Sequence, residues 1–216
     1  MKIFSVYNQK HRRIFLLAIY LLPLSFLCAQ QKPDALKMYQ AGQYKAAIEV
    51  CLNEIKLNPN NMDSYVVLGW ALIADGQYAK AVKCCEEAKK ISEYDPRILF
   101  SHGEACFALG KNADALNSLQ NYIIYAPNGN KLAFVYYYFG EIYIRLKKYA
   151  HADIAFTTAV QLSPQFAPWW ERLGYVREQL REFKFALQAY EQALVLDKNL
   201  HDAQNGRSRV LSLLQR

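Results

Sequence analysis

The sequence lacks the short motifs on which most enzyme chemistry depends. It contains no glycine-rich phosphate loop, no H-E-x-x-H pair, no nucleophile elbow and no C-x-x-C-H haem signature. It also has no lysine- and arginine-rich run of the kind that binds nucleic acid, and no N-x-Ser/Thr glycosylation acceptor. These absences argue against an enzyme and against a nucleic-acid-binding protein. We therefore expect no cofactor and no bound metal.

The segment from Met1 to Ala29 differs in composition from the rest of the chain. Four basic residues between Lys2 and Arg13 precede the apolar run IFLLAIYLLPLSFLCA, which ends at Ala29. A basic start, an apolar run and a small residue before a polar stretch are typical of a secretory signal peptide. We predict cleavage after Ala29, which would make Gln30 the first residue of the mature protein.

Two other interpretations of this segment stay open. A retained membrane anchor needs about 20 apolar residues, whereas this run is shorter and contains Pro23. A lipid on Cys28 would require a small residue before it, and that residue is Leu27. Contact with a membrane is expected only if the segment is retained.

Export would have consequences for charge, location and cysteine chemistry. The whole chain carries a net charge of +7, but residues 30–216 hold 22 basic and 19 acidic residues, a net charge of +3. The absence of glycosylation acceptors favours a bacterial periplasm or cell envelope over secretion from a eukaryotic cell.

An oxidising compartment favours disulfides, but spacing alone does not say which cysteines are paired. Four cysteines follow the signal: Cys51, Cys84, Cys85 and Cys106.

A regular repeat runs through the remaining chain. Glycines recur at nearly equal intervals, at positions 69, 103, 140 and 174. Alanines keep the same intervals at positions 47, 81, 115, 152 and 186. A fixed period of about 34 residues is the signature of stacked supersecondary units and takes precedence over local propensity.

Each unit is predicted to consist of two helices. The stretch VYYYFGEIY favours a buried strand by propensity alone, but Tyr136, Phe139, Gly140 and Tyr143 lie at i, i+3, i+4 and i+7, on one helix face. Turns such as QAGQY and ADGQY would join the helices, with glycine supplying the positive φ. We expect Gly140 and Ala152 to be small because two helix backbones pass closely there.

The residue order in these units resembles the tetratricopeptide repeat, W-x2-L-G-x2-Y…A-x3-F…P. One unit reads Tyr136-x2-Phe139-Gly140-x2-Tyr143…Ala152-x3-Phe156…Pro164. The resemblance implies an all-α, right-handed superhelical solenoid of antiparallel helix pairs. We expect five units, at about 30–61, 62–95, 96–132, 133–166 and 167–200, the first with a short opening helix near Pro33. A capping helix, 201–216, would cover the last unit with Val210, Leu211 and Leu214, since end units lack a neighbour.

The resemblance also implies a binding site for a protein partner. In this family, ligands lie along a concave groove lined by the first helix of each unit. The corresponding residues here are Val66, Trp70, Ile73, Phe100, Glu104, Phe107, Tyr137, Glu141, Ile144, Glu171, Tyr175 and Glu178. Eight of the twelve are apolar or aromatic, and every charged one is glutamate. The family version that grips an acidic chaperone tail uses Lys, Asn and Arg, and Arg97 and Arg145 are too few and too far apart to replace that set.

We therefore expect a non-enzymatic interaction scaffold. Its groove would hold an apolar or amphipathic segment of a partner, because exposed apolar patches rich in Trp and Tyr mark interaction surfaces. A basic residue of the partner could face the glutamates. The alternative is a self-assembling structural component of the cell envelope, a homo-oligomer in which the capping helix of one chain enters the groove of another.

One further cluster combines Cys84, Cys85, His102 and Cys106. His102 and Cys106 are four residues apart on a predicted helix, which is the spacing that two metal ligands would need. These positions are core positions of the repeat, and cysteine is commonly buried. We expect core packing, while a Cys85–Cys106 disulfide and a metal site stay open as alternatives.

Overall fold

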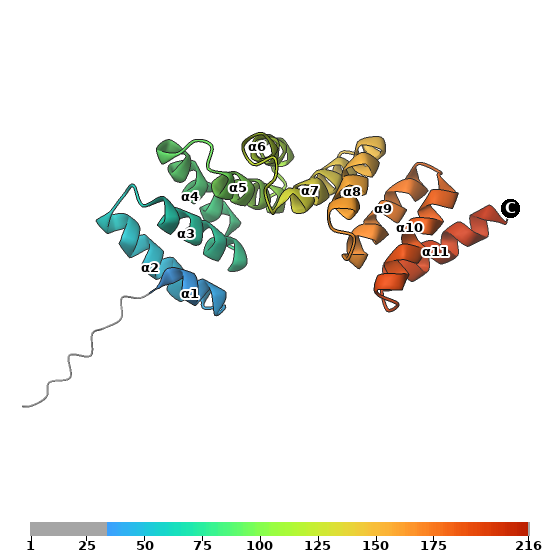
Figure 1. Cartoon of the computed structure of the whole chain (residues 1–216), viewed down its shortest axis with the longest axis horizontal. Helices are drawn as coiled ribbons and strands as arrows, with labels where there is room; N and C mark the ends of the chain where they lie inside the picture. Colours follow the sequence, from blue (N-terminus) through green and yellow to red (C-terminus); the bar gives the residue numbers. More distant parts are fainter. Residues whose placement is uncertain (1–33, 216) are drawn as a thin grey trace, which may run out of the picture. The chain divides into compact units, whose positions relative to one another are not determined.

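The computed structural model describes residues 34–215, and the predicted signal segment with Cys28 lies outside these residues. All regular structure in the described part is α-helical (Figure 1). None of the described helices is both long and apolar enough to cross a bilayer. The helices are α1 (Ala35–Gln40), α2 (Tyr44–Leu57), α3 (Met62–Ala74), α4 (Tyr78–Ile91), α5 (Pro96–Ala108), α6 (Asn112–Tyr125), α7 (Leu132–Arg145), α8 (Tyr149–Leu162), α9 (Ala167–Gln179), α10 (Phe183–Leu196) and α11 (His201–Leu214).

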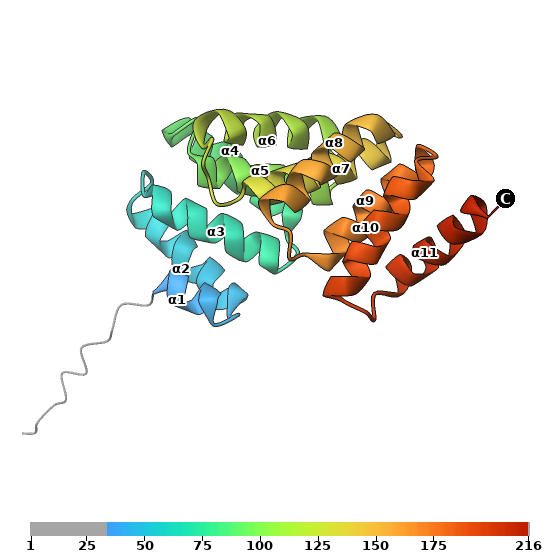
Figure 2. The ribbon, with the colours of Figure 1, turned by 45° about the vertical axis from the view of Figure 1, so that its right-hand side comes forward.

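The helices pack in chain order as a stack of pairs. Figures 1 and 2 show α1 to α11 following one another along the stack, each beside its predecessor in sequence. α1 packs on α2, α3 on α4, α5 on α6, α7 on α8 and α9 on α10, and α11 closes the series against α10 and α9. The predicted all-α solenoid of helix pairs is confirmed, and the aromatic stretch that favours a strand by propensity lies in helix α7.

Local signals in the sequence define where helices begin and end. Asp34 caps α1 by accepting a hydrogen bond from the Lys37 backbone N–H at 3.1 Å, and Asp95 caps α5 in the same way. The turn between α3 and α4 contains Gly76 at φ +74°, as the sequence predicts. In the fifth pair the same turn position is Arg181, at φ +62°, although a non-glycine side chain disfavours this backbone conformation.

Helix pairs are held together where a small residue meets a large ring. A Cβ at position 140 would lie 2.5 Å from the Phe156 ring, which is fully buried on α8. Gly174 faces the buried ring of Tyr190 on α10 in the same way. The sequence correctly predicts a small residue at 140, but the reason differs: an aromatic side chain, rather than the backbone of the neighbouring helix, fills the space.

The last helix covers the fifth pair less completely than the sequence predicts. Val210 is fully buried, Leu211 is half-buried, and Leu214 remains 39% exposed. Gly206 lies against the ring of Tyr190, where any side chain would collide with the aromatic atoms. α11 therefore seals the core around Tyr190 and leaves its own C-terminal end open to solvent.

The packing at Gly140 predicts a contrast between two glycines at the same repeat position. Gly140→Ala should lower the free energy of unfolding by about 1–3 kcal/mol, because the new methyl overpacks against Phe156. Gly69→Ala should be tolerated or stabilise by up to about 1 kcal/mol, because a Cβ at position 69 lies 3.8 Å from the Cys85 sulfur and alanine favours the helix. Urea unfolding of both variants tests this, and equal losses of stability would contradict it.

Candidate functional site

The first helices of successive pairs, α3, α5, α7 and α9, carry the twelve residues predicted to line a groove; we call their surface the first-helix face. Two of the twelve do not lie at this surface. Val66 is 1% exposed and Phe100 is 8% exposed, so both side chains pack mainly into the core. The structure leaves the other ten partly exposed: Trp70, Ile73, Glu104, Phe107, Tyr137, Glu141, Ile144, Glu171, Tyr175 and Glu178.

Three of the four glutamates on this face are engaged within the chain. Glu104 accepts a hydrogen bond from the Tyr138 hydroxyl at 2.8 Å. Glu141 receives two hydrogen bonds from the Arg172 guanidinium, at 2.5 and 2.9 Å. These contacts join α5 to α7 and α7 to α9. Both carboxylates therefore brace neighbouring first helices, and a basic group of a partner would have to compete with these contacts.

Glu178 has the same role at the end of the stack. Its carboxylate accepts from the Tyr190 hydroxyl at 2.7 Å and from Arg209 of α11 at 2.9 and 3.0 Å. These hydrogen bonds hold the pKa of Glu178 below its ordinary value despite partial burial, which acts in the opposite direction. The sequence could have indicated this bracing role. In both Glu141–Arg172 and Glu178–Arg209 the arginine follows the glutamate by the same number of residues, so the pair repeats with the units.

Glu171 differs from the other three. It is half-buried, and within residues 34–215 it makes neither a hydrogen bond nor an ion pair. Burial raises its pKa to about 7; Asp202 and Glu141 act in the same direction, and Arg172 and Arg209 oppose them. Glu171 is thus the carboxylate of this face that is available to a cation from outside the chain.

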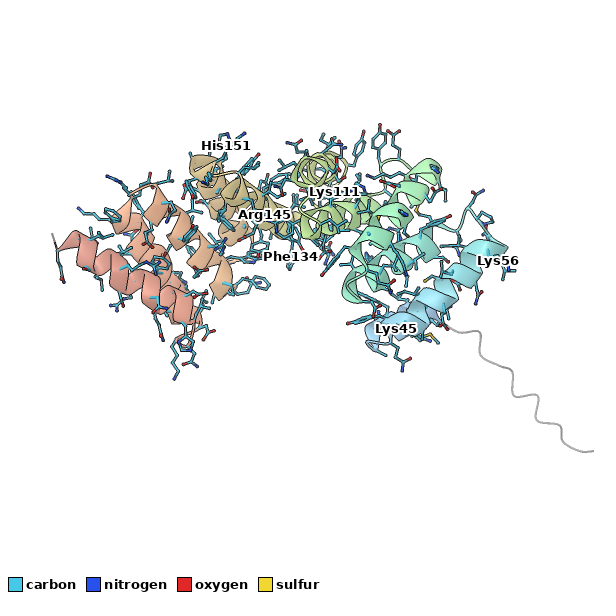
Figure 3. The ribbon with its side chains drawn as sticks, turned by 180° about the vertical axis from the view of Figure 1, so that it is seen from behind. Lys45, Lys56, Lys111, Phe134, Arg145 and His151 are labelled. Carbon is cyan, nitrogen blue, oxygen red and sulfur yellow. The ribbon has the colours of Figure 1, made fainter. Side chains whose placement is uncertain are left out.

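Aromatic side chains on the face also pack between pairs. Tyr137 stacks on Trp169 with ring centroids 5.4 Å apart, and Trp169 in turn meets Phe134 edge-on at 5.2 Å. The ring centroids of Phe107 and Tyr138 lie 5.0 Å apart. Trp169 and Tyr138, which lie outside the set predicted from the sequence, therefore support the partly exposed rings and fix their orientation. Figure 3 shows Phe134 on α7, near the middle of the stack.

The two arginines near the face have their own partners. Arg97 bonds to Asp95 at 2.7 Å and to Asp63 at 2.8 Å. Arg145, labelled in Figure 3, donates to the Phe107 carbonyl at 2.8 Å and lies over the Phe107 ring at 3.8 Å. Neither arginine is arranged with others into a site for a carboxylate tail.

The cysteine and histidine cluster lies in the core. Cys51, Cys84, Cys85 and Cys106 are buried free thiols in the structure, and burial raises the pKa of Cys51 and Cys84 to about 12. His102 Nδ1 lies 2.7 Å from the Ser118 hydroxyl and 3.7 Å from the Cys106 sulfur. Among residues 34–215, no group of three or more His, Cys, Asp or Glu side chains is arranged to hold a metal ion.

His102 occupies a position that other pairs fill with Leu68, Phe139 or Leu173. Burial, with Lys89 nearby, lowers its pKa from 6.5 to about 4; Lys111 acts in the same direction and Asp114 opposes them. The folded protein therefore keeps a neutral imidazole in its core over the whole physiological pH range.

This depressed pKa predicts a loss of stability in mild acid. The unfolded chain binds the proton first as pH falls, so stability present above pH 6.5 is lost progressively between about 6.5 and 4, by up to about 3 kcal/mol. The double variant His102→Leu/Ser118→Ala carries side chains found at these positions in other pairs and should remove this part of the pH dependence. Urea unfolding at several pH values measures this dependence. If the free energy of unfolding of the variant depends on pH as steeply as that of the wild type, the attribution to His102 is contradicted.

Comparison with known proteins agrees with the repeat geometry. Residues 135–166 and 170–204 match the tetratricopeptide repeat, and residues 40–122 match the family "Anaphase-promoting complex, cyclosome, subunit 3". RNA polymerase II-associated protein 3 of Xenopus tropicalis is 28% identical over 141 residues, which are 65% of this chain and 19% of that protein. The chain spans only 12–24% of the length of the curated relatives it matches.

Solved structures share the fold at low sequence identity. MamA superposes with a TM-score of 0.68 and 20% identity over 77% of this chain and 95% of that chain. The Pseudomonas aeruginosa pilF structure gives a TM-score of 0.74 and 15% identity over 84% of this chain and 81% of that chain. The stacked helix pairs and the matching repeat families define the class as a helical-repeat solenoid, a class that presents extended binding surfaces. Within that class, the chain is a tetratricopeptide repeat protein.

Proposed function

We propose that this protein is a non-enzymatic adaptor that binds an apolar or amphipathic segment of a partner protein along the first-helix face. The observation that carries the proposal is the row of partly exposed apolar and aromatic side chains at one position after another of the repeat. Such residues are enriched among the side chains that contribute most to protein interfaces. The row consists of Trp70, Ile73, Phe107, Tyr137, Ile144 and Tyr175.

The charge on the face limits which side chains a partner segment can place against it. Because Glu104, Glu141 and Glu178 already hold intrachain partners, Glu171 is the carboxylate that would receive a basic side chain. A lysine or arginine placed there would stabilise the ionised carboxylate and lower the pKa of Glu171 from about 7. We infer a partner segment with apolar residues that contact the row and one basic residue near α9.

Peptide selection tests the proposal. Amphipathic peptides selected from a random 12-residue library displayed on phage should bind the wild-type protein. Ile144→Ala/Tyr175→Ala should weaken that binding at least tenfold, because both side chains lie on the face. The matched control is Ile154→Ala/Phe185→Ala, which removes side chains that are 68% and 56% exposed on the second helices α8 and α10.

The control variant should bind like the wild type, and circular dichroism should show that both variants fold. If Ile144→Ala/Tyr175→Ala binds the peptides as tightly as the wild type does, the proposed site is contradicted. If no peptide is enriched and the particle size grows with protein concentration, the self-assembling structural alternative would replace the adaptor.

We further propose that the protein is exported to a bacterial periplasm or cell envelope. The support is the sequence of residues 1–29, with its basic start, apolar run and Ala29 before a polar stretch. Mass spectrometry of the protein purified from its native cells should find Gln30 as the first residue. A chain that still begins at Met1 would contradict cleavage. A lipid attached to Cys28 would instead show that the exported protein is anchored to a membrane.

A further inference from the structure

The turns inside the last three helix pairs carry exposed basic side chains. These turns join α5 to α6, α7 to α8 and α9 to α10, and they follow one another along one edge of the stack because they hold the same place in each unit. We call residues 109–114, 145–150 and 179–184 the turn patch. Two acidic residues, Asp114 and Glu182, face six basic ones: Lys111, Arg145, Lys147, Lys148, Arg181 and Lys184.

The positive charge of the turn patch is not neutralised by the described part of the chain. All six basic side chains are exposed, and within residues 34–215 none of them forms an ion pair. Arg145 bonds to neutral groups, the Phe107 carbonyl and the Asn112 side chain of the neighbouring turn. Figure 3 shows Arg145 and Lys111 together near the middle of the stack.

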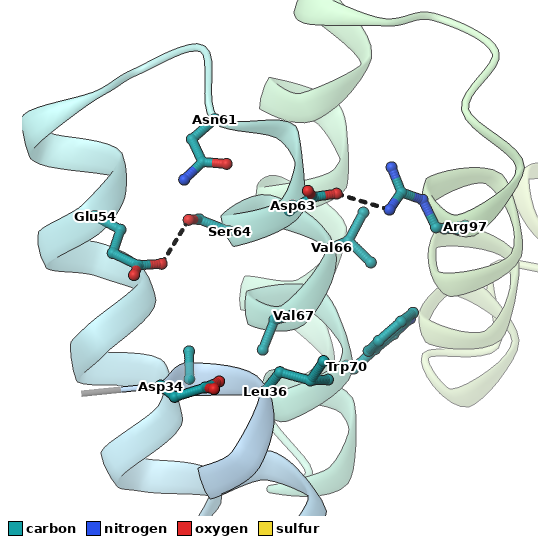
Figure 4. A pocket seen from close by; sticks show the side chains of 11 residues that line it. Asp34, Leu36, Glu54, Asn61, Asp63, Ser64, Val66, Val67, Trp70 and Arg97 are labelled. Carbon is teal, nitrogen blue, oxygen red and sulfur yellow. Dashed lines mark hydrogen bonds and ion pairs between the residues drawn. The ribbon is translucent and has the colours of Figure 1, made fainter. Parts of the chain in front are cut away.

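The opposite edge of the stack, formed by the loops between pairs, treats its arginine differently. Arg97 lies in the wall of a cavity of about 470 Å³ beside α1 and bonds to Asp63 at 2.8 Å (Figure 4). It also bonds to Asp95 at 2.7 Å. The unpaired cations of the turn patch are therefore a property of that edge and not of the whole surface.

Two basic residues of the patch occupy a backbone conformation that favours glycine. The first three turns have Gly42, Gly76 and Gly110 at φ between +73° and +75°. At the same position the last two turns have Lys147 at φ +57° and Arg181 at φ +62°. A side chain disfavours this conformation, and residues held in it are concentrated at functional sites. The fold itself does not require a basic side chain at either position.

Each of the three turns also begins with a leucine. Leu109 and Leu146 are 41% and 42% exposed, and Leu180 is half-buried. The equivalent residues after the first helices of the first two pairs are Ala41 and Asp75. A helix pair therefore forms without a leucine at this place, and the patch presents apolar side chains directly beside basic ones.

We propose that the turn patch docks the protein on an anionic lipid surface, with the leucines in the headgroup region and the basic side chains against the lipid phosphates. Binding to such a surface grows with the apolar area buried at the interface and with the attraction between basic residues and anionic lipids. The charge is spread over three successive turns, which suits an extended surface better than a single carboxylate. This contact depends neither on residues 1–29 nor on the first-helix face.

Co-sedimentation with lipid vesicles tests the proposal on protein purified from its native cells. The wild type should bind vesicles that contain about one-third phosphatidylglycerol at least tenfold more tightly than vesicles of phosphatidylcholine alone, and salt should weaken this binding. Lys147→Gly/Arg181→Gly should bind the anionic vesicles at least fivefold more weakly, because two charges are lost. Since glycine relieves the positive φ, this variant should melt close to the wild type or above it.

The matched control removes two exposed lysines from the opposite edge. Lys56→Gln/Lys198→Gln has the same net charge as the first variant and should change binding to anionic vesicles less than twofold. A third variant, Leu109→Ala/Leu146→Ala, keeps the charge and should weaken binding at least threefold, because less apolar area is buried. Alanine already occupies this position in the first pair.

The outcomes separate this inference from its rivals. Equal binding to anionic and neutral vesicles would overturn it, and so would wild-type binding by Lys147→Gly/Arg181→Gly. If the wild type does not bind the vesicles but binds poly-glutamate through Lys147 and Arg181, the patch recognises an acidic protein segment and the lipid inference is wrong. Peptides that bind the first-helix face should bind this variant as tightly as the wild type, so either proposal can fail without the other.

Discussion

The packing of a small first-helix residue against a large side chain of the second helix is the contact on which the stack depends. Gly103 faces Leu119, Gly140 faces Phe156 and Gly174 faces Tyr190, at distances that leave no room for a Cβ. Each contact sets how closely two helices approach, and therefore which side chains of the first helix still reach the surface. The packing at Gly69 is looser than at the other three glycines, because the side chain opposite it is Cys85, which is smaller than an aromatic ring or a leucine.

Once the helix pairs are fixed, polar contacts across the first-helix face join each unit to the next. Tyr138 binds Glu104, Arg172 binds Glu141 and Arg209 binds Glu178. The first two contacts are partly buried and hold first helices in register, since an acid left there without its partner would lose both a hydrogen bond and solvent. The third is exposed and joins α9 to α11. The same residues that look like a charged binding site in the sequence therefore serve mainly to connect the repeats.

Two departures from the repeat place polar residues where the other units have apolar ones. His102 and Ser118 replace apolar residues inside the core, and their hydrogen bond accompanies a buried imidazole that makes stability depend on pH. Glu54 and Ser64 replace apolar residues in the lining of a cavity beside α1, where the Ser64 hydroxyl donates to the Glu54 carboxylate. In the first case burial keeps the His102 imidazole neutral.

The sequence by itself determines the helices, the period and the fold class, because apolar spacing and turn glycines are local properties of the chain. It also predicts that Gly140 must be small. It does not determine which of the predicted groove residues reach the surface: Val66 and Phe100 share a predicted face with Trp70, but only the packed structure buries them. Tertiary structure likewise decides that Glu171 is available while Glu141 and Glu178 are not, because their arginine partners lie on helices that are distant in sequence. The cavity beside α1 also arises only when α2 and α3 pack together, since its walls come from helices that are separate in sequence.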